Sequence, residues 1–394
     1  MSQYVDQARA LQEQLVAWRR EIHMHPELGF EEKRTSGFVA DNLRQMGLEI
    51  QTGVGITGIV ARIGDGNGPV IGIRADMDAL PIQEANNVPY ASKTPGLMHA
   101  CGHDAHTAIL MGVAKLLNET QDLPSGEIRL LFQPSEERWD SEGKSGATRM
   151  MDDRALEGLD AVIALHVDSG APAGQVEIGG GFVAAAVDDF DGVILGEGCH
   201  GASPHKGFDP IYIQAQVVNA IQGIRSRRID PTQPAVITIG TIHGGSATNI
   251  IPNEVRMTGT IRSFSEDIRD QLHAELDRAF GVAKALGGDY TLKIQRGYPA
   301  LYNDPGVADL IRQVSTSAIG DAKTVGGVAQ MGAEDFAYMA KAAPGAMFML
   351  GARFDDLNRP HHSPIFDINE DCFQVGAAVL AESAVRLLRE KSQR

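Results

Sequence analysis

Cysteine is scarce in this sequence, which has 394 residues and three cysteines. Cys101, Cys199 and Cys372 are odd in number and far apart, so they do not form a disulfide framework, as fits a reducing cytosol. The start of the chain also lacks a basic region followed by an apolar run, and no apolar stretch is long enough to cross a bilayer. We therefore expect a cytoplasmic protein with neither a signal peptide nor a membrane partner.

Basic residues are also in the minority. Lysine and arginine number 35 against 51 aspartates and glutamates, which gives a formal net charge of -16. No basic block offsets this charge, and so nucleic acid and anionic membrane surfaces are excluded as partners. The sequence also lacks a glycine-rich fingerprint after a strand, which argues against a phosphate- or nucleotide-binding protein.

The chain does have the length expected of two globular domains. Apolar strand patterns alternate with amphipathic helix patterns through much of it, which indicates an α/β fold. The expected strands cover 58–63, 70–75, 126–132, 161–165 and 346–350. The expected helices cover 5–22, 31–46, 107–118, 304–318 and 370–390, and one more begins at 334.

From about residue 183 the pattern becomes that of a separate small domain. Strands are expected over 183–195, 235–242, 255–261 and 290–295, and helices over 210–227 and 265–286. The order β-α-β-β-α-β is that of a ferredoxin-like unit, and about 110 residues is an ordinary size for a small domain. We therefore expect residues 185–297 to be inserted into a domain formed by residues 1–184 and 298–394.

Three expected strands of the first domain end in acidic or imidazole side chains. Asp76 and Asp78 follow the strand over 70–75, Glu136 and Glu137 follow the strand over 126–132, and His166 follows the strand over 161–165. Ligands gather at the carboxyl ends of strands in open α/β sheets, and a core strand gains nothing from such side chains at one fixed end. The pattern predicts a polar site at this edge.

The stretch from Met98 to His106 adds more side chains that can bind metal. Cys101 and His103 are one residue apart, and a thiolate with an imidazole suits zinc best among the divalent ions. The alternative is a buried free cysteine beside polar loop histidines, because short metal motifs also occur by chance. The candidates from the whole chain are Asp76, Asp78, Cys101, His103, Glu136, Glu137, His166, His361 and His362.

The adjacent glutamates Glu136 and Glu137 predict two different chemical roles. Consecutive residues in a loop can point in different directions, so one carboxylate can bind metal while its neighbour takes a proton from the attacking water. The alternative for this pair is a solvated loop, since surface acids are common.

Longer motifs give the chain a resemblance to one known family. It is similar over nearly its whole length to M20-type metallo-amidohydrolases, in the branch of hippurate hydrolases, N-acyl-amino-acid deacylases and auxin-conjugate hydrolases. The motifs are 72–81 (GIRADMDALP), 98–106 (MHACGHDAH), 132–137 (FQPSEE), 200–205 (HGASPH), 244–252 (GGSATNIIP), 332–336 (GAEDF) and 362–364 (HSP). Together they are very specific, although no single one is.

The resemblance implies a metal-dependent exopeptidase-like domain, with helices on both faces of a mixed sheet, that binds two divalent ions, zinc or manganese. Its metal ligands would be Cys101, His103, Glu137, His166 and His362. Cys101 would bridge the two ions. His361, next to His362, is the alternative ligand, but His362 directly precedes Ser-Pro as in the family motif.

The resemblance also implies roles for the carboxylates beside the ligands. Glu136 would be the general base that later passes its proton to the leaving amine. Asp76 and Asp78 would orient ligand imidazoles. The peptidase branch of the family has a histidine in place of Asp76 and an aspartate at Asp78, so this chain matches the cysteine-containing branch instead.

The inserted domain would supply a lid and a subunit interface, by the same resemblance, and the protein would be a homodimer or a higher homo-oligomer. His200 would stabilise the oxyanion, often in the site of the partner subunit, while Asn249 and Arg262 would hold the substrate. The implied reaction is hydrolysis of an N-acyl amino acid to a carboxylic acid and a free amino acid. The alternatives are a dipeptidase or aminoacyl carboxypeptidase of the same fold, and a non-catalytic metal-binding scaffold.

Overall fold

The computed structural model describes residues 3–392, and the chain divides into two compact units. The first unit comprises Met1–Val183, Tyr302–Val328 and Asp335–Arg394, and the second comprises Ala184–Leu301 and Ala329–Glu334. Each unit has its own hydrophobic core.

The first unit is built on an eight-stranded mixed sheet in the order β1-β2-β4-β3-β5-β16-β6-β15. Its strands are β1 (Glu49–Val54), β2 (Gly58–Gly64), β3 (Val70–Asp76), β4 (Glu127–Gln133), β5 (Ala161–Asp168), β6 (Val176–Ile178), β15 (Thr324–Gly326) and β16 (Gly345–Gly351). The central strands β4, β3, β5 and β16 are parallel neighbours. They are buried on both faces, which explains their nearly continuous apolar sequences.

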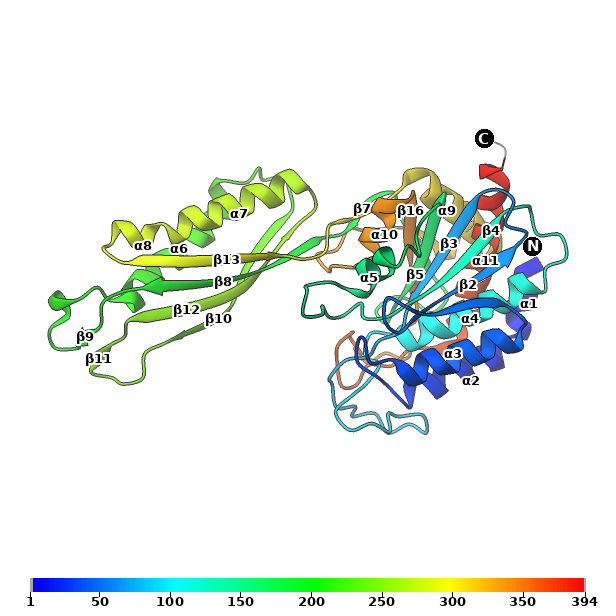
Figure 1. Cartoon of the computed structure of the whole chain (residues 1–394), viewed down its shortest axis with the longest axis horizontal. Coiled ribbons are helices and arrows are strands. Elements are labelled where there is room, and N and C mark those ends of the chain that lie inside the picture. The colour runs from blue at the N-terminus through cyan, green and yellow to red at the C-terminus, as the bar shows by residue number, and fades with distance from the viewer. Residues whose placement is uncertain (1–2, 393–394) are drawn as a thin grey trace. The chain divides into compact units, whose positions relative to one another are not determined.

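Helices cover both faces of this sheet, as predicted (Figure 1). The helices of the unit are α1 (Gln3–Ala10), α2 (Gln12–His23), α3 (Lys33–Gln45), α4 (His103–Asn118), α5 (Gly146–Asp152), α9 (Pro305–Ile319), α10 (Phe336–Ala342) and α11 (Phe373–Lys391). The side chains of Ile71, Ile73 and Ala75 join the core beneath α4 and α11. The alternate positions of β3 face the side of α5 and α10, where Gly72 lies against Leu159.

Several bounds differ from the sequence predictions for physical reasons. The expected helix over 5–22 is two helices, α1 and α2, separated at Leu11. Helix α4 begins at His103 rather than at 107, directly after Gly102, which has a φ of 94°. Strand β1 and helix α5 were not predicted, because β1 is a mostly exposed edge strand without an apolar pattern and α5 has only seven residues.

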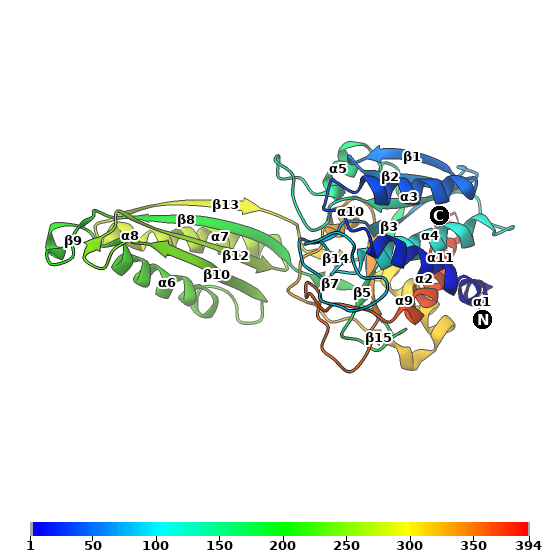
Figure 2. The same cartoon turned by 90° about the horizontal axis from the view of Figure 1, so that it is seen from below.

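The second unit has a four-stranded antiparallel sheet in the order β10-β12-β8-β13 (Figure 2). Its main elements are β8 (Ala186–Leu195), α6 (Pro210–Arg227), β10 (Ala235–Gly244), β12 (Glu254–Ser263), α7 (Glu266–Phe280), the short α8 (Val282–Ala285) and β13 (Asp289–Arg296). Ser265 caps the start of α7, because its hydroxyl accepts a hydrogen bond from the Ile268 N–H at 3.3 Å. The order of elements and of strands is ferredoxin-like.

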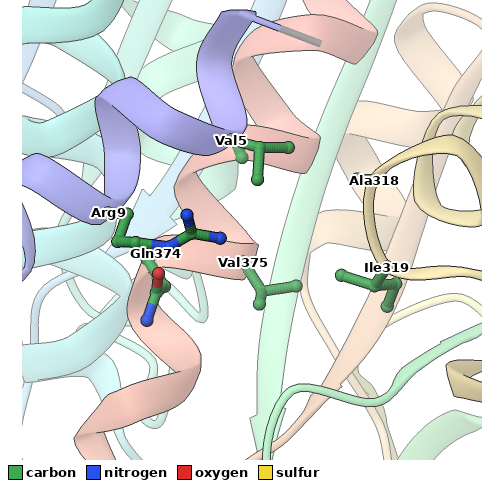
Figure 3. Close-up of a pocket in the computed structure, with 7 residues that line it drawn as sticks. Val5, Arg9, Ala318, Ile319, Gln374 and Val375 are labelled. Carbon is green, nitrogen blue, oxygen red and sulfur yellow. The ribbon is translucent and has the colours of Figure 1, made fainter. Parts of the chain in front are cut away.

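The outer helices of the first unit border a small pocket that is separate from the predicted site residues. Figure 3 shows Val5 and Arg9 of α1 beside Gln374 and Val375 of α11, with Ile319 of α9 opposite. Within residues 3–392, no helix combines the length and apolar character that crossing a bilayer requires.

Candidate metal centre

The sheet register brings the carboxyl ends of three parallel strands to one edge. Asp76, the last residue of β3, pairs with Gln133, the last residue of β4. On the other side of β3, Arg74 pairs with Ala164, two residues before His166. The loops that follow β3 and β4, and the end of β5, therefore deliver their polar side chains to the same place.

The five predicted ligands meet at this edge in overlapping groups. Cys101, His103 and His166 form one group, and Cys101, Glu137 and His362 form another, with the ligand atoms of each group within 4.8 Å of one another. The Cys101 Sγ lies 3.5 Å from the His166 Nε2, and the His362 Nε2 lies 3.0 Å from the Glu137 Oε1. Cys101 belongs to both groups.

Glu136 joins the same cluster. Its carboxylate lies within 4.8 Å of the ligand atoms of His103 and Glu137. The side chain is 7% exposed, so the solvated loop that the sequence left open for this pair does not describe it. A buried acid beside a group of metal-binding side chains is suited to receive a proton from water.

The chemistry of the donor set fits a metal ion. Among the residues that the structure describes, the His103 Nε2 is buried without a hydrogen-bond partner, and an unsatisfied ring nitrogen is costly in the interior. Burial raises the pKa of the Cys101 thiol well above its usual value, so a cation is needed to hold it as the thiolate. A thiol, imidazoles and a carboxylate gathered together are typical of a zinc or related divalent site.

Asp78 orients both a ligand and the glutamate turn. Its Oδ1 lies 3.2 Å from the His103 Nδ1 and accepts the Glu136 N–H at 3.0 Å, while its Oδ2 accepts the Glu137 N–H at 3.0 Å. Although burial alone favours the neutral acid, these bonds and the His103 ring lower the pKa of Asp78. Because Asp78 holds the Nδ1 side of the His103 ring, the other ring nitrogen, Nε2, is directed to the cluster of metal-binding side chains.

Asp76 acts through His106, which the sequence did not single out. The Asp76 Oδ1 lies 2.6 Å from the His106 Nδ1, and the Val167 N–H donates to the His106 Nε2 at 2.9 Å. Burial lowers the pKa of His106 to about 4, so the ring is neutral and donates its Nδ1 proton to Asp76. His106 thereby fixes the backbone next to His166. The spacing of His103 and His106 by three residues in one helix was the available signal.

The structure treats the adjacent histidines His361 and His362 differently. His362 has a left-handed φ of 60°, and its N–H donates to the Ala100 O at 2.8 Å, which places its ring near Glu137. The His361 Nε2 instead accepts a hydrogen bond from the Ser169 N–H at 3.4 Å. Of the two, His362 is the one grouped with Cys101 and Glu137 among the described residues.

A buried ion network beneath the site was also missed. Arg19 of α2 is fully buried and donates to Asp104 at 2.7 Å, and the His23 Nδ1 lies 2.7 Å from the same carboxylate. Despite the cost of burial, the charges of Arg19 and His23 hold the pKa of Asp104 far below its usual range. His23 therefore has a structural role in this network.

The other predicted residues lie in the second unit. His200 is exposed on β9 (Cys199–His200) and pairs with Ile250 of β11 (Ile250–Ile251), while the Asn249 O accepts the Gly201 N–H at 2.8 Å. His200 and Asn249 are thus neighbours. Arg262 pairs with Val187 near the start of β8, at the opposite end from Leu195, so the unit does not bring Arg262 beside His200.

Comparison with known proteins identifies one family. The profile of peptidase family M20/M25/M40 matches residues 72–386 of this chain. The chain is 41% identical over 383 residues to N-acetyl-L-cysteine deacetylase of Bacillus subtilis, covering 96% of this chain and 89% of the relative. It is 40% identical over 386 residues to thermostable carboxypeptidase 2 of Saccharolobus solfataricus, covering 96% of both chains.

A solved structure agrees with these sequence matches. The YXEP protein of Bacillus subtilis, described as a dinuclear metal-binding peptidase, superposes with a TM-score of 0.84 at 33% identity. The superposition covers 97% of this chain and 99% of the other.

Proposed function

This chain belongs to peptidase family M20/M25/M40, as its motifs predicted, and from that membership we propose that it hydrolyses N-acyl amino acids. It is a metal-dependent hydrolase of amide bonds. The proposed products are a carboxylic acid and a free amino acid. The observation that carries the proposal is the position of Glu136, which is buried beside the cluster of metal-binding side chains without being one of the five proposed ligands.

Two divalent ions are the proposed cofactors. Cys101, His103, Glu137, His166 and His362 would hold them, with Cys101 shared. Such ions polarise an acyl carbonyl and lower the pKa of a water molecule toward 7. The thiolate favours zinc because it is a soft ligand, and manganese is the alternative.

The residues of the chain account for the proton transfers. Glu136 takes a proton from the attacking water as the new C–O bond forms, and it returns that proton to the amide nitrogen as the C–N bond breaks. The reaction adds one water molecule across the amide bond, so water supplies the hydroxyl group of the acid and one hydrogen of the amine. Asp78 keeps Glu136 in place by accepting its N–H.

The second unit is proposed to complete the site. His200 would donate a hydrogen bond to the oxyanion, and Asn249 and Arg262 would bind the substrate, in a homodimer formed through the inserted domain. What supports His200 and Asn249 is their adjacency on the β9–β11 pair. Arg262 has weaker support, since it lies at the other end of its sheet.

The experiment that tests the function measures release of free amino acid from N-acetyl, N-benzoyl and indoleacetyl amino acids and from unblocked dipeptides. The enzyme is stripped with a chelator and reloaded separately with Zn²⁺ or Mn²⁺. We expect turnover of an N-acyl class that depends on the added metal. Metal binding without turnover of any substrate would instead indicate a scaffold.

Substitution Glu136→Gln tests the assigned base. The amide keeps the size of the side chain but cannot take a proton, so we expect both metal ions to stay bound while kcat falls by about 10²–10⁴. Metal content by mass spectrometry and kcat on the best substrate decide the outcome. Full activity in this variant would remove Glu136 from the mechanism.

A dipeptidase or aminoacyl carboxypeptidase is the second candidate function. The 40% identical relative is named as a carboxypeptidase, which favours this alternative. A higher kcat/KM for a dipeptide than for the matching N-acetyl amino acid would support it.

A further inference from the structure

Residues 27–32 contact both the loop after β3 and the turn that carries the two glutamates. The Ala79 N–H donates to the Glu27 O at 2.8 Å, and Leu28 forms a parallel bridge with Ala79. A Cβ added to Gly29 would lie 2.2 Å from the Ser135 Oγ, so the absence of a side chain at this position permits the contact. This segment therefore forms one wall of the turn after β4.

Each of the three consecutive N–H groups in the turn donates to a buried carboxyl group. The Ser135 N–H donates to the Glu32 Oε1 at 2.8 Å, and those of Glu136 and Glu137 donate to Asp78. Ser135 has a φ of 43°, in the left-handed region that is unfavourable for a residue with a Cβ. Such a conformation persists only where its surroundings hold it, and the contact with Glu32 supplies part of that support.

Glu32 is itself held firmly. Its side chain is fully buried, and the Thr57 hydroxyl donates to its Oε2 at 2.5 Å. Burial raises the pKa of Glu32 to about 7. A neutral carboxyl group still offers a carbonyl oxygen to the Ser135 N–H, so the contact persists in either protonation state.

We propose that Glu32 is a positioning residue of the hydrolytic site, which holds the Ser135 N–H and thereby directs Glu136 and Glu137. Glu32 acts through the backbone at Ser135 and belongs to none of the groups of metal-binding side chains among the described residues. This inference rests on the function proposed above, because it assumes that Glu136 is the base.

Glu27 provides a matched control. It is also a glutamate next to the start of α3, and its carboxylate accepts hydrogen bonds from the Arg34 N–H, the Thr35 N–H and the Thr35 hydroxyl at 2.8–3.0 Å. None of these bonds involves the glutamate turn. Loss of Glu27 therefore weakens the same helix without releasing Ser135.

The experiment compares Glu32→Ala, Glu32→Gln and Glu27→Ala in the full chain. We expect kcat of Glu32→Ala to fall about 10–100-fold with little change in KM or metal content, because the base is misplaced rather than removed. Glu32→Gln keeps an oxygen for the Ser135 N–H and should remain within a few-fold of wild type. Glu27→Ala should keep its kcat.

Hydrogen exchange of the metal-free protein provides a readout that is independent of catalysis. Peptides covering 134–138 should exchange faster in Glu32→Ala than in wild type or in Glu27→Ala. If Glu32→Ala does not fold, Thr57→Val should give faster exchange in these peptides, since it frees the other oxygen of Glu32.

The possible failures are distinguishable. Wild-type enzyme without hydrolytic activity would overturn the proposed function. Hydrogen exchange of peptides covering 134–138 would still show whether Glu32 restrains the turn. An active wild type with Glu32→Ala matching Glu27→Ala in kcat and exchange would overturn the role of Glu32. An equal loss of activity in Glu32→Gln and Glu32→Ala would overturn the claim that Glu32 acts by accepting the hydrogen bond of the Ser135 N–H.

Discussion

Glu32 shows at the residue scale how burial changes a carboxyl group. Its pKa is raised by burial from 4.5 to about 7. Between these values the folded protein binds more protons than the unfolded chain at this residue, and so the free energy of unfolding falls as the pH rises through this range. Above about pH 7 Glu32 is ionised in both the folded and the unfolded state, and the free energy of unfolding falls no further because of this residue.

Substitution Glu32→Gln tests this linkage in the metal-free protein. Because glutamine does not ionise, the variant should gain stability relative to wild type as the pH rises from about 4.5 to 7, by at most about 3 kcal/mol. The difference should then stay constant above this range. Urea unfolding at a series of pH values measures it, and a difference independent of pH would contradict the raised pKa.

Helices α2 and α4 show at the element scale how charged side chains join two helices in the interior. Arg19 of α2 and Asp104 of α4 have no exposed side-chain surface, and the carboxylate also contacts His23. A buried pair of this kind is weak evidence of net stabilisation, yet removal of one partner leaves an uncompensated charge. The pair therefore fixes which surfaces of the two helices meet.

Substitution Asp104→Asn should lower the free energy of unfolding by about 1.5–3 kcal/mol, since Arg19 loses its shortest buried ion pair but keeps Asp367 at 3.3 Å and Glu370 at 3.2 Å. Asp6→Asn is the control, because Asp6 pairs with Arg9 on an exposed surface of α1. An exposed pair contributes at most about 1 kcal/mol. Denaturant unfolding measures the free energy of unfolding of both variants. Similar losses of stability in the two would show that the buried pair contributes no more than the exposed one.

At the scale of the whole molecule, the residues proposed for the site come from both units. The five proposed metal ligands and Glu136 belong to the first unit, whereas His200 and Asn249 belong to the second. Substitution His200→Ala should lower kcat by about 10²–10³ without loss of metal, as expected for removal of an oxyanion donor.

A mixture of His200→Ala and Glu136→Gln subunits tests whether His200 serves a partner. If it does, a mixed dimer contains one site with both an intact Glu136 and an intact His200, and activity should partly return. The two variants are unfolded together and refolded, with each variant refolded alone as the control. No gain in the mixture would indicate that His200 does not act on the partner.

The sequence alone determined where the apolar strands and amphipathic helices lie and the kinds of side chain that end the strands. Apolar strands such as β3 and amphipathic helices such as α6 leave a local pattern, so their positions followed from periodicity. Strand β1 and helix α5 were missed because a polar edge strand and a short helix have little pattern of their own.

Tertiary structure alone decided which of these side chains meet. The contact of Glu32 with Ser135, the bond of His106 to the Val167 backbone and the burial of Arg19 each join distant parts of the chain. No local pattern encodes such contacts, because they depend on how the sheet and its helices pack. The same packing gives His361 and His362 different surroundings although they are neighbours in sequence.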